Sequence, residues 1–509
     1  MIGRLVALAL RFRLLVVGAV LALVALGLAA MLRIPFDAYP DLTGTRVEVI
    51  TTAPGLAAEE VERLVTYPIE SALMGIQGAE GVRSTSKGGL SLVTVGFADR
   101  VDVYFARTLV QQRLGDAAGN LPAGVEPSLG PVSTPMGELY QYTLRSDSLS
   151  LADLKTLHDY VVRPRLRTVP GVSEVNSWGG VVEQVQVEVD PVRLAARGLT
   201  LADVHDALAR NNVSFGGGYV ESAGERFTVR GVGRVERPAE LARVVVAMRG
   251  EVPVLVGDVA TVVSGALPRH GAVTQDGRGE VVGGMVLKLQ GADSRRVIAA
   301  VKARLVEIRA SLPPHVAITP FYDQTELVAR TTGTIVRNLV EGGLLVVAVL
   351  FLFLRNWRAS LIVASVIPLA MLATFVAMGA FGHSANLMSL GALDFGLIVD
   401  ASVVMMENFV RRLEEHPERG GAGEARLALF RDAAAEVGRP ILFGIAIIVA
   451  VYLPLFALDG MEGRMFRPMA FTVVCAVLAS LLLALTYVPA VAGWVLTHAA
   501  DRPAPWMAR

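Results

Sequence analysis

Long apolar segments alternate with polar stretches along this chain, and their lengths predict a membrane protein. A helix that crosses a bilayer core of about 30 Å needs about 20 predominantly apolar residues, and six segments meet this requirement. They are residues 14–32, 336–354, 361–380, 388–409, 441–458 and 469–496. Because the sequence between the first two segments has an ordinary soluble composition, we expect one span, a large external domain and then five clustered spans.

The large domain shows a repeated order of strand-like and helix-like segments. Strand-like Arg46–Thr52 and an amphipathic stretch are followed by GVRSTSKGG, LSLVTVGF and a helix over Val103–Ala118, which is the β-α-β-β-α order of a ferredoxin-like unit. The order starts again with ELYQYTLRS, VSEVNSW and VEQVQVEV and closes with EVVGGMVLKLQ and VAITPFYD. An insertion interrupts this second copy. It holds a helix near Leu201–Asn211 and a Gly-rich hairpin, SFGGGYVESAGERFTVRGVGRV.

These patterns predict a membrane α-helical bundle of six transmembrane helices plus a large α+β domain of duplicated ferredoxin-like units with an inserted subdomain. The expected parts are the N-terminus with the first span (1–33), a first unit (34–135), the first part of a second unit (136–180), the insertion with its protruding hairpin (181–270), the closing part of the second unit (271–334), spans two to six (335–498) and a tail (499–509).

Basic residues in the short loops predict the orientation. With the N-terminus inside, the opposite short loops hold only Arg464 and Arg467. The cytoplasmic side then holds Arg4, Arg11, Arg13, Arg355, Arg358, Arg411, Arg412, Arg419, Arg426, Arg431, Arg439, Arg502 and Arg509. This asymmetry places both termini in the cytoplasm and the large domain outside it. The first span is longer than the apolar region of a signal peptide, so we expect it to stay uncleaved.

Three acidic residues, Asp394, Asp400 and Glu407, lie inside the apolar segment 388–409. A carboxylate at membrane depth indicates a functional site, often a proton or ion relay. At 100° per residue, Asp400 and Glu407 fall within about 20° of one helix face, while Asp394 lies about 120° round the axis. The three acids span about 20 Å of axial rise, a large part of the bilayer core. We therefore expect a proton relay through this helix.

Each acid also has a structural interpretation. Asp400 could form a buried structural pair, and Asp394 could be a helix-end residue in an aqueous vestibule. Glu407 lies four residues before Arg411, so it could form an i,i+4 ion pair on the cytoplasmic side. Met405 and Met406 are interpreted as packing residues rather than as soft-metal ligands.

Composition and motifs argue against several other classes of protein. The 47 basic residues balance the 47 acidic ones, which argues against a nucleic-acid partner. A lone Cys475 and seven scattered His leave no disulfide framework and no compact thiol or imidazole site, so the metal ligands stay unknown. Neither a nucleophile–base constellation nor a nucleotide-binding loop occurs in the sequence, so we expect no enzymatic activity and no cofactor.

The chain strongly resembles the N-terminal half of a resistance-nodulation-division (RND) transporter over nearly its whole length. The resemblance rests on IPFDAYPDLT at 34–43, FLRNWRASLIVASVIPLA after the second span, NLMSLGALDFGLIVDASVVMMEN in the fourth, and RPILFGIAIIVAVYLPLFALDGMEGRMFRPMAFT across the fifth and sixth. It implies a location in the bacterial inner membrane, with the large domain in the periplasm. It also implies a homotrimer, held together in part by the protruding hairpin of a docking subdomain.

The acidic helix resembles one branch of this superfamily. Drug exporters usually carry adjacent aspartates in a VDDA pattern, whereas here VDAS keeps Asp400 and places Ala401 beside it. The branch for zinc, cobalt, cadmium or nickel typically has DFGxxVDxxVVMxEN, which this chain matches from Asp394 to Asn408. The copper and silver branch usually lacks the first aspartate. The resemblance therefore implies export of divalent heavy-metal cations by proton antiport, with a periplasmic membrane fusion protein and an outer-membrane channel as partners.

RND pumps of this branch resemble two such halves fused, so a C-terminal half is also expected, as a separate chain if the pump is split. Truncation and self-assembly of this half are further interpretations of its length. Two functional alternatives also stay open. One is an RND-type exporter of another substrate, such as a drug or lipid, or a SecDF-like accessory. The other is a truncated remnant that does not transport.

Overall fold

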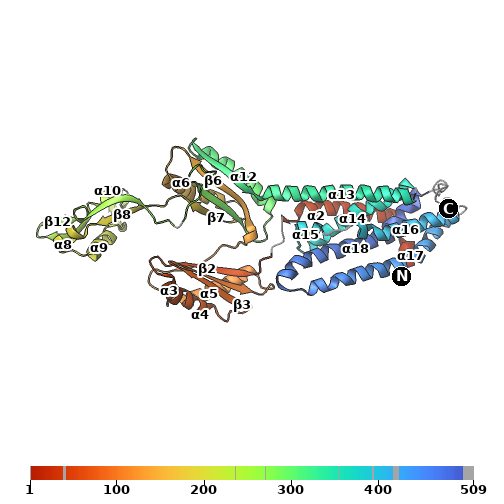
Figure 1. Ribbon diagram of the computed structural model, residues 1–509, viewed down its shortest axis with the longest axis horizontal. Helices are drawn as coiled ribbons and strands as arrows, with labels where there is room; N and C mark the ends of the chain where they lie inside the picture. The colour runs from red at the N-terminus through yellow and green to blue at the C-terminus, as the bar shows by residue number, and fades with distance from the viewer. Residues whose placement is uncertain are drawn as a thin grey trace.

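The structure is a computed structural model that describes residues 2–37, 42–235, 237–269, 271–354, 356–391, 395–416 and 424–496. Figure 1 shows an elongated molecule with a bundle of long helices at one end, two α/β units beside it, and a smaller unit at the far end. The N-terminus lies at the end of the bundle that is remote from the α/β units. The membrane part and the soluble part thus follow one another along the long axis.

A helix lies at each of the six predicted spans. These helices are α2 (Arg13–Arg33), α13 (Gln324–Leu354), α14 (Trp357–Ala380), α15 with α16 (Leu387–Gly391 and Phe395–Glu415), α17 (Glu424–Tyr452) and α18 (Gly460–Val495). Among the described residues, four helices are long and apolar enough to cross a membrane: α2, α14, α18, and α17 with the 3₁₀ turn Leu453–Ala457. Their mean hydropathy is 2.4 to 2.8.

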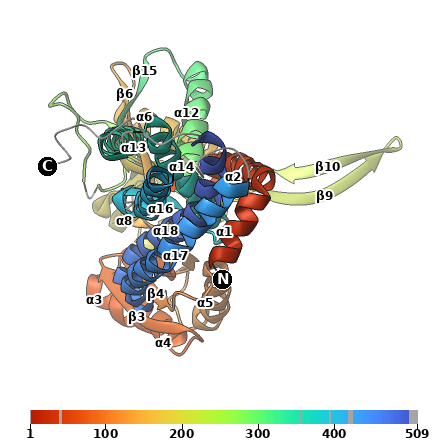
Figure 2. The same ribbon diagram turned by 90° about the vertical axis from the view of Figure 1, so that its right-hand side faces the viewer.

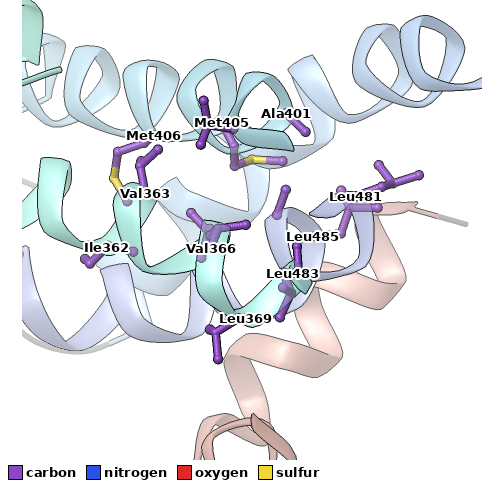
Figure 3. Packing of buried hydrophobic residues seen from close by; sticks show 14 of the residues in the cluster. Ile362, Val363, Val366, Leu369, Ala401, Met405, Met406, Leu481, Leu483 and Leu485 are labelled. Atoms are coloured by element: carbon purple, nitrogen blue, oxygen red, sulfur yellow. The ribbon is translucent and has the colours of Figure 1, made fainter. Parts of the chain in front are cut away.

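The helices of the bundle share one apolar core, to which α14, α16, α17 and α18 contribute most. Figure 3 shows Val363 of α14 close to Met406 of α16, with Met405 on the same side of that helix. Both methionines are fully buried, as expected for packing residues. α2 approaches α14 closely at Gly27, where a Cβ atom would lie 2.6 Å from the Leu372 Cβ.

The first α/β unit contains a four-stranded antiparallel sheet with the strand order β3-β4-β2-β5. This is the strand order that a β-α-β-β-α-β chain produces when each helix crosses over the same face. Alternate residues of β2 and β4 face the helices and form the core of the unit. The elements are β2 (Arg46–Thr52), α3 (Ala58–Val61), α4 (Tyr67–Leu73), β3 (Ala79–Lys87), β4 (Leu90–Phe97), α5 (Val103–Ala118) and β5 (Pro127–Leu129).

The second unit repeats this topology with the strand order β15-β6-β14-β7. Its elements are β6 (Glu138–Ser146), α6 (Leu151–Leu157), α7 (Arg163–Arg167), β7 (Val172–Gly179), β14 (Val282–Lys288), α12 (Ser294–Ser311) and β15 (Val316–Asp323). One expectation is wrong. The segment VEQVQVEV forms β8 (Glu183–Val189), which does not join this sheet but pairs with β13 (Ala260–Ala266). The position beside β7 is occupied by β14, which is buried along its whole length.

The insertion forms the small unit at the far end of the molecule (Figure 1). The remaining elements are α8 (Pro191–Ala196), α9 (Leu201–Asn211), β9 (Phe215–Ser222), β10 (Glu225–Gly231), α10 (Pro238–Leu241), β11 (Val245–Arg249), β12 (Val252–Leu255) and α11 (Val256–Val259). β9 and β10 form the predicted hairpin, and Figure 2 shows it projecting away from the body. Every residue of β9 is exposed.

The two sheet units share an irregularity that marks them as copies. In each unit the first helix contains a π-helical turn, at Glu62–Thr66 and at His158–Val162. A proline follows each turn at the same distance, Pro68 in the first unit and Pro164 in the second. Since proline has no N–H to donate to the preceding turn, the wider π turn accommodates it inside a continuous helix. The same solution at the same place supports an internal duplication.

Two further elements connect the parts of the chain. Helix α1 (Ile2–Arg11) packs on α17 and α18 through Val6 and Leu10, which are buried. Strand β1 (Phe36–Asp37), directly after α2, pairs in parallel with β16 (Ala385–Asn386), which precedes α15. The exit from the first span is therefore tied to the entry of the acidic helix.

Candidate functional site

Helix α16 has one buried face and one exposed face, and the acids lie on the exposed one. Asp400 and Glu407 are exposed, together with Val404 between them and Arg411 one turn further on. The opposite face is buried against the bundle and consists of Ile398, Val399, Ala401, Ser402, Met405, Met406, Asn408, Phe409, Val410 and Leu413. The helices of this chain thus leave a stripe that carries two carboxylates uncovered. The third predicted acid, Asp394, lies outside the described residues.

Arg411 pairs with Glu436 and not with Glu407, so the alternative i,i+4 ion pair is not formed. The Arg411 guanidinium donates to Asn408 Oδ1 at 2.7 Å and lies 3.3 Å from the Glu436 carboxylate on α17. Arg412 donates to the same Glu436 at 2.8 Å. The Glu436 carboxylate, on α17, accepts hydrogen bonds from both arginines and from the Asn408 side-chain amide, the last at 3.3 Å. Arg411 therefore pairs with Glu436 and not with Glu407. This cluster anchors the C-terminal end of α16 and leaves Glu407 outside it.

Helix α18 holds the acidic segment from its buried side. The Thr472 hydroxyl donates to the Ser389 carbonyl of α15 at 3.0 Å. Two turns further along α18, the Ser480 hydroxyl donates to the Ile398 carbonyl of α16. These two hydrogen bonds hold both α15 and the first turn of α16 against α18. A shift of α16 along its axis would therefore break contacts with α18 or carry α18 with it.

The N-terminal end of α18 binds the first α/β unit through Arg464. Its guanidinium makes a bidentate ion pair with Asp99, in the turn between β4 and α5, with one nitrogen 3.3 Å from Oδ2. A third nitrogen donates to the Leu42 carbonyl at 2.8 Å. Gly44 makes room for this side chain, because a Cβ at that position would lie 2.6 Å from the guanidinium. Sequence reasoning treated Arg464 only as a loop charge and missed this contact.

The second α/β unit is joined to the membrane helices in two ways. Strand β15 ends at Asp323 and α13 begins at the next residue, so this unit continues directly into a predicted span. At the start of α12, Arg296 donates to the Leu32 carbonyl at 3.2 Å and Arg295 approaches the Ile34 carbonyl at 3.5 Å. Both carbonyls belong to the C-terminal end of α2, where positive charge is favoured.

A buried polar cluster lies under the sheet of the second unit. His158 is fully buried in the π-helical turn, with Nε2 3.0 Å from the Tyr142 hydroxyl and Nδ1 3.1 Å from Asp159 Oδ1. Burial lowers the pKa of His158, and a neutral imidazole satisfies both contacts when Nδ1 donates to Asp159. Lys155 lies 3.3 Å from the other Asp159 oxygen and donates to the Ser177 hydroxyl at 2.5 Å. The π turn thus places consecutive polar side chains in the interior.

We expect Asp159→Asn to destabilise the second unit by about 1–2 kcal/mol at neutral pH, because a charged hydrogen-bond partner of buried His158 is lost. Burial opposes ionisation of Asp159, but hydrogen bonds from His158 and Ser177 and the charge of Lys155 lower its pKa from 3.8 to about 2. A depressed folded-state pKa stabilises the protein above the unfolded-state pKa, and this stabilisation is lost as the pH falls from about 4 to about 2.

Thermal unfolding of the purified protein across this pH range checks that prediction. The difference in melting temperature between the wild type and Asp159→Asn should shrink at low pH. Asp147→Asn is the matched control, since the Asp147 side chain is 89% exposed and pairs with Arg145 at the surface. Equal effects of the two substitutions would contradict a structural role for the cluster.

The described residues do not assemble a metal centre by themselves. Within them, no three His, Cys, Asp or Glu side chains come close enough together to hold a metal ion. Cys475 lies within α18 and is partly buried. The metal ligands of this chain are therefore not assigned.

Comparison with known proteins agrees with the arrangement of the helices and units. Residues 5–508 match the AcrB/AcrD/AcrF family. The chain is 46% identical over 502 residues to the cobalt-zinc-cadmium resistance protein CzcA of Cupriavidus metallidurans, covering 96% of this chain and 47% of that protein. It is 40% identical over 522 residues to the nickel and cobalt resistance protein CnrA of the same organism, covering 96% and 48%.

A crystal structure of a heavy metal efflux pump superimposes with a TM-score of 0.86 and 37% identity, covering 96% of this chain and 48% of the pump. The chain thus spans about half the length of the relatives that it matches. Those relatives are efflux and resistance proteins and not enzymes, as expected from the sequence. The chain belongs to the AcrB/AcrD/AcrF family of resistance-nodulation-division transporters, and its relatives include heavy-metal efflux proteins.

Proposed function

We propose that this chain is one half of a proton-driven RND pump that exports divalent heavy-metal cations by proton antiport. The observation that carries the proposal is the exposed stripe of Asp400 and Glu407 on α16. An aspartate facing hydrocarbon at mid-membrane costs about 2.5–3.5 kcal/mol, so such a stripe needs water or another protein surface beside it. The second half of the pump provides that surface, in the same polypeptide or as a separate chain.

The proposed membrane arrangement has six spans, formed by α2, α13, α14, α15 with α16, α17 and α18. The N- and C-termini are cytoplasmic and the α/β units are periplasmic. The arrangement is supported by the arginine-rich loops on one side and by the position of the N-terminus, at the end of the bundle remote from the α/β units. The protein is then a multi-pass component of the inner membrane.

Protons that move inward would neutralise Asp400, with Asp394 and Glu407 as further relay groups. Neutralisation removes the cost of a charge in a low-dielectric environment and so changes the preferred position of α16. The hydrogen bonds from Thr472 and Ser480 connect α16 to α18, and Arg464 connects α18 to the first α/β unit. Protonation and the conformation of the periplasmic units are then coupled, as antiport requires.

The proposed pump is a homotrimer that works with a periplasmic membrane fusion protein and an outer-membrane channel. The exposed β9–β10 hairpin is suited to reach a neighbouring protomer. The proposed substrates are zinc, cobalt, cadmium or nickel ions. The resistance proteins named for cobalt, zinc, cadmium and nickel among its relatives support this choice.

The substrate class can be tested in cells that lack their own metal exporters. Expression of this chain with its C-terminal half should raise the inhibitory concentrations of zinc, cobalt, cadmium or nickel salts. It should leave those of silver salts and of a hydrophobic drug unchanged. Resistance that extended equally to silver or to the drug would place the chain in another branch of the family.

A further inference from the structure

A groove separates the outer ends of α2 and α14 and faces the side of the bundle where the α/β units lie. It has a volume of about 450 Å³. Its walls are apolar and contain small residues, Ala29 and Ala30 on α2 and Val376 and Gly379 on α14. Arg33 and His383 lie at its upper rim. This volume is in the range of small-molecule sites, which are usually apolar clefts with a few polar groups.

The groove follows from the way the two helices cross. At Gly27 the helices touch, because Leu372 fills the space that a side chain would need. Beyond this contact α14 ends at Ala380. At Gly382 a φ of +72° turns the chain, and the His383 N–H donates to the Met378 carbonyl at 2.9 Å. The His383 ring then packs on Phe471 of α18, with ring centroids 4.5 Å apart. The gap between the helix ends is therefore part of the fold.

Positive charge gathers at the rim of the groove. Arg33 is exposed at the last position of α2, directly after the predicted span, and Arg295 and Arg296 reach the carbonyls at the same helix end. Asp293 lies 3.8 Å from Arg295 and 3.6 Å from Arg296. Because Arg33 ends the apolar helix α2, we place its guanidinium at the depth of the lipid headgroups, where it can bind an anionic oxygen with charge-assisted hydrogen bonds.

We propose that the α2–α14 groove binds one glycerophospholipid from the leaflet that faces the α/β units, with an acyl chain between the helices and the phosphate against Arg33. The apolar walls suit a hydrocarbon chain, and the arginine at the rim suits a phosphodiester. Because Arg295 and Arg296 hold the second α/β unit against the same end of α2, the bound lipid lies at the junction of this unit with the membrane.

The test uses the full-length protein in nanodiscs that contain phosphatidylglycerol with a photoactivatable diazirine in one acyl chain. After illumination, mass spectrometry should find adducts concentrated at Ala29, Ala30 and Val376. Gly379→Leu, which fills the groove, and Arg33→Gln, which removes the cation, should each lower these adducts by about fivefold or more. The matched controls are Gly444→Leu on an exposed position of α17 and Arg358→Gln at the opposite end of α14, and both should retain wild-type labelling.

Three results would overturn the proposal. Adducts spread evenly over the lipid-facing helices, and unchanged in Gly379→Leu, would show that the groove has no preference for lipid. Full labelling in Arg33→Gln would remove the phosphate contact. Equal labelling by a diazirine fatty acid would show that no glycerophospholipid is required. Gel filtration checks the fold of each variant, and Ala29→Met offers a second way to fill the groove if Gly379→Leu does not fold.

Discussion

Replacing Asp400 with Asn should abolish metal resistance when the chain is expressed with its C-terminal half. Asparagine has the shape of aspartate but cannot take up and release a proton, so the neutral state of α16 becomes permanent. We expect the transport rate to fall at least about tenfold, which corresponds to about 1.4 kcal/mol in the barrier. The amount of protein in the membrane should not change, because the residues that pack α16 into the bundle lie on its other face.

Asp432→Asn is the matched control for this experiment. Asp432 lies on α17 and not on α16, is exposed, and pairs with Arg431 at 3.1 Å. This variant should keep wild-type resistance. Asp400→Glu, which preserves a titratable carboxylate, should keep part of it. Resistance that survived Asp400→Asn unchanged would show that protons do not pass through this position.

Local sequence signals predicted the soluble elements well. The helices over Val103–Ala118 and Leu201–Asn211 have the predicted bounds. Their first turns explain this, because Asp102 accepts hydrogen bonds from two backbone N–H groups of α5, and Thr200 and Asp203 form a capping box at the start of α9. The position of β8 could not be predicted in the same way. Its alternating pattern identifies a strand, but not the sheet that the strand joins.

At the candidate site, too, local features could be predicted from the sequence, whereas contacts between distant segments could not. Helical periodicity alone placed Asp400 and Glu407 on one face, and both are on the exposed stripe of α16. The pairing of Arg411 with Glu436 could not be predicted, because Glu436 comes from another helix and no local sequence spacing indicates the contact. The contact between Arg464 and Asp99 joins residues that are 365 positions apart. Interactions of this kind depend on how whole units pack against one another. The local pattern of a single sequence does not show this packing.

The ion pair between Arg464 and Asp99 should be needed for transport although it contributes little to stability. Partly exposed ion pairs stabilise a protein by about 0–1 kcal/mol, so Arg464→Ala should leave expression and melting temperature almost unchanged. It should nevertheless lower metal resistance severalfold, because it releases α18 from the first α/β unit. Exchanging the two charges, in Asp99→Arg with Arg464→Asp, should restore part of the resistance that each single reversal removes.

Arg467→Ala is the matched control. It separates the loss of coupling between α18 and the first α/β unit from a general effect of substitutions at this end of α18. Arg467 lies one turn beyond Arg464 on α18, and its ion pair with Asp459 at 2.6 Å is local to the start of that helix. It does not reach the α/β unit through this pair, so the variant should transport normally. The hydrogen bond to the Leu42 carbonyl is lost with Arg464 in the charge exchange, which is why the recovery is expected to be partial. Equal losses in Arg464→Ala and Arg467→Ala, or no recovery in the double reversal, would show that α18 does not act on the first unit through this contact.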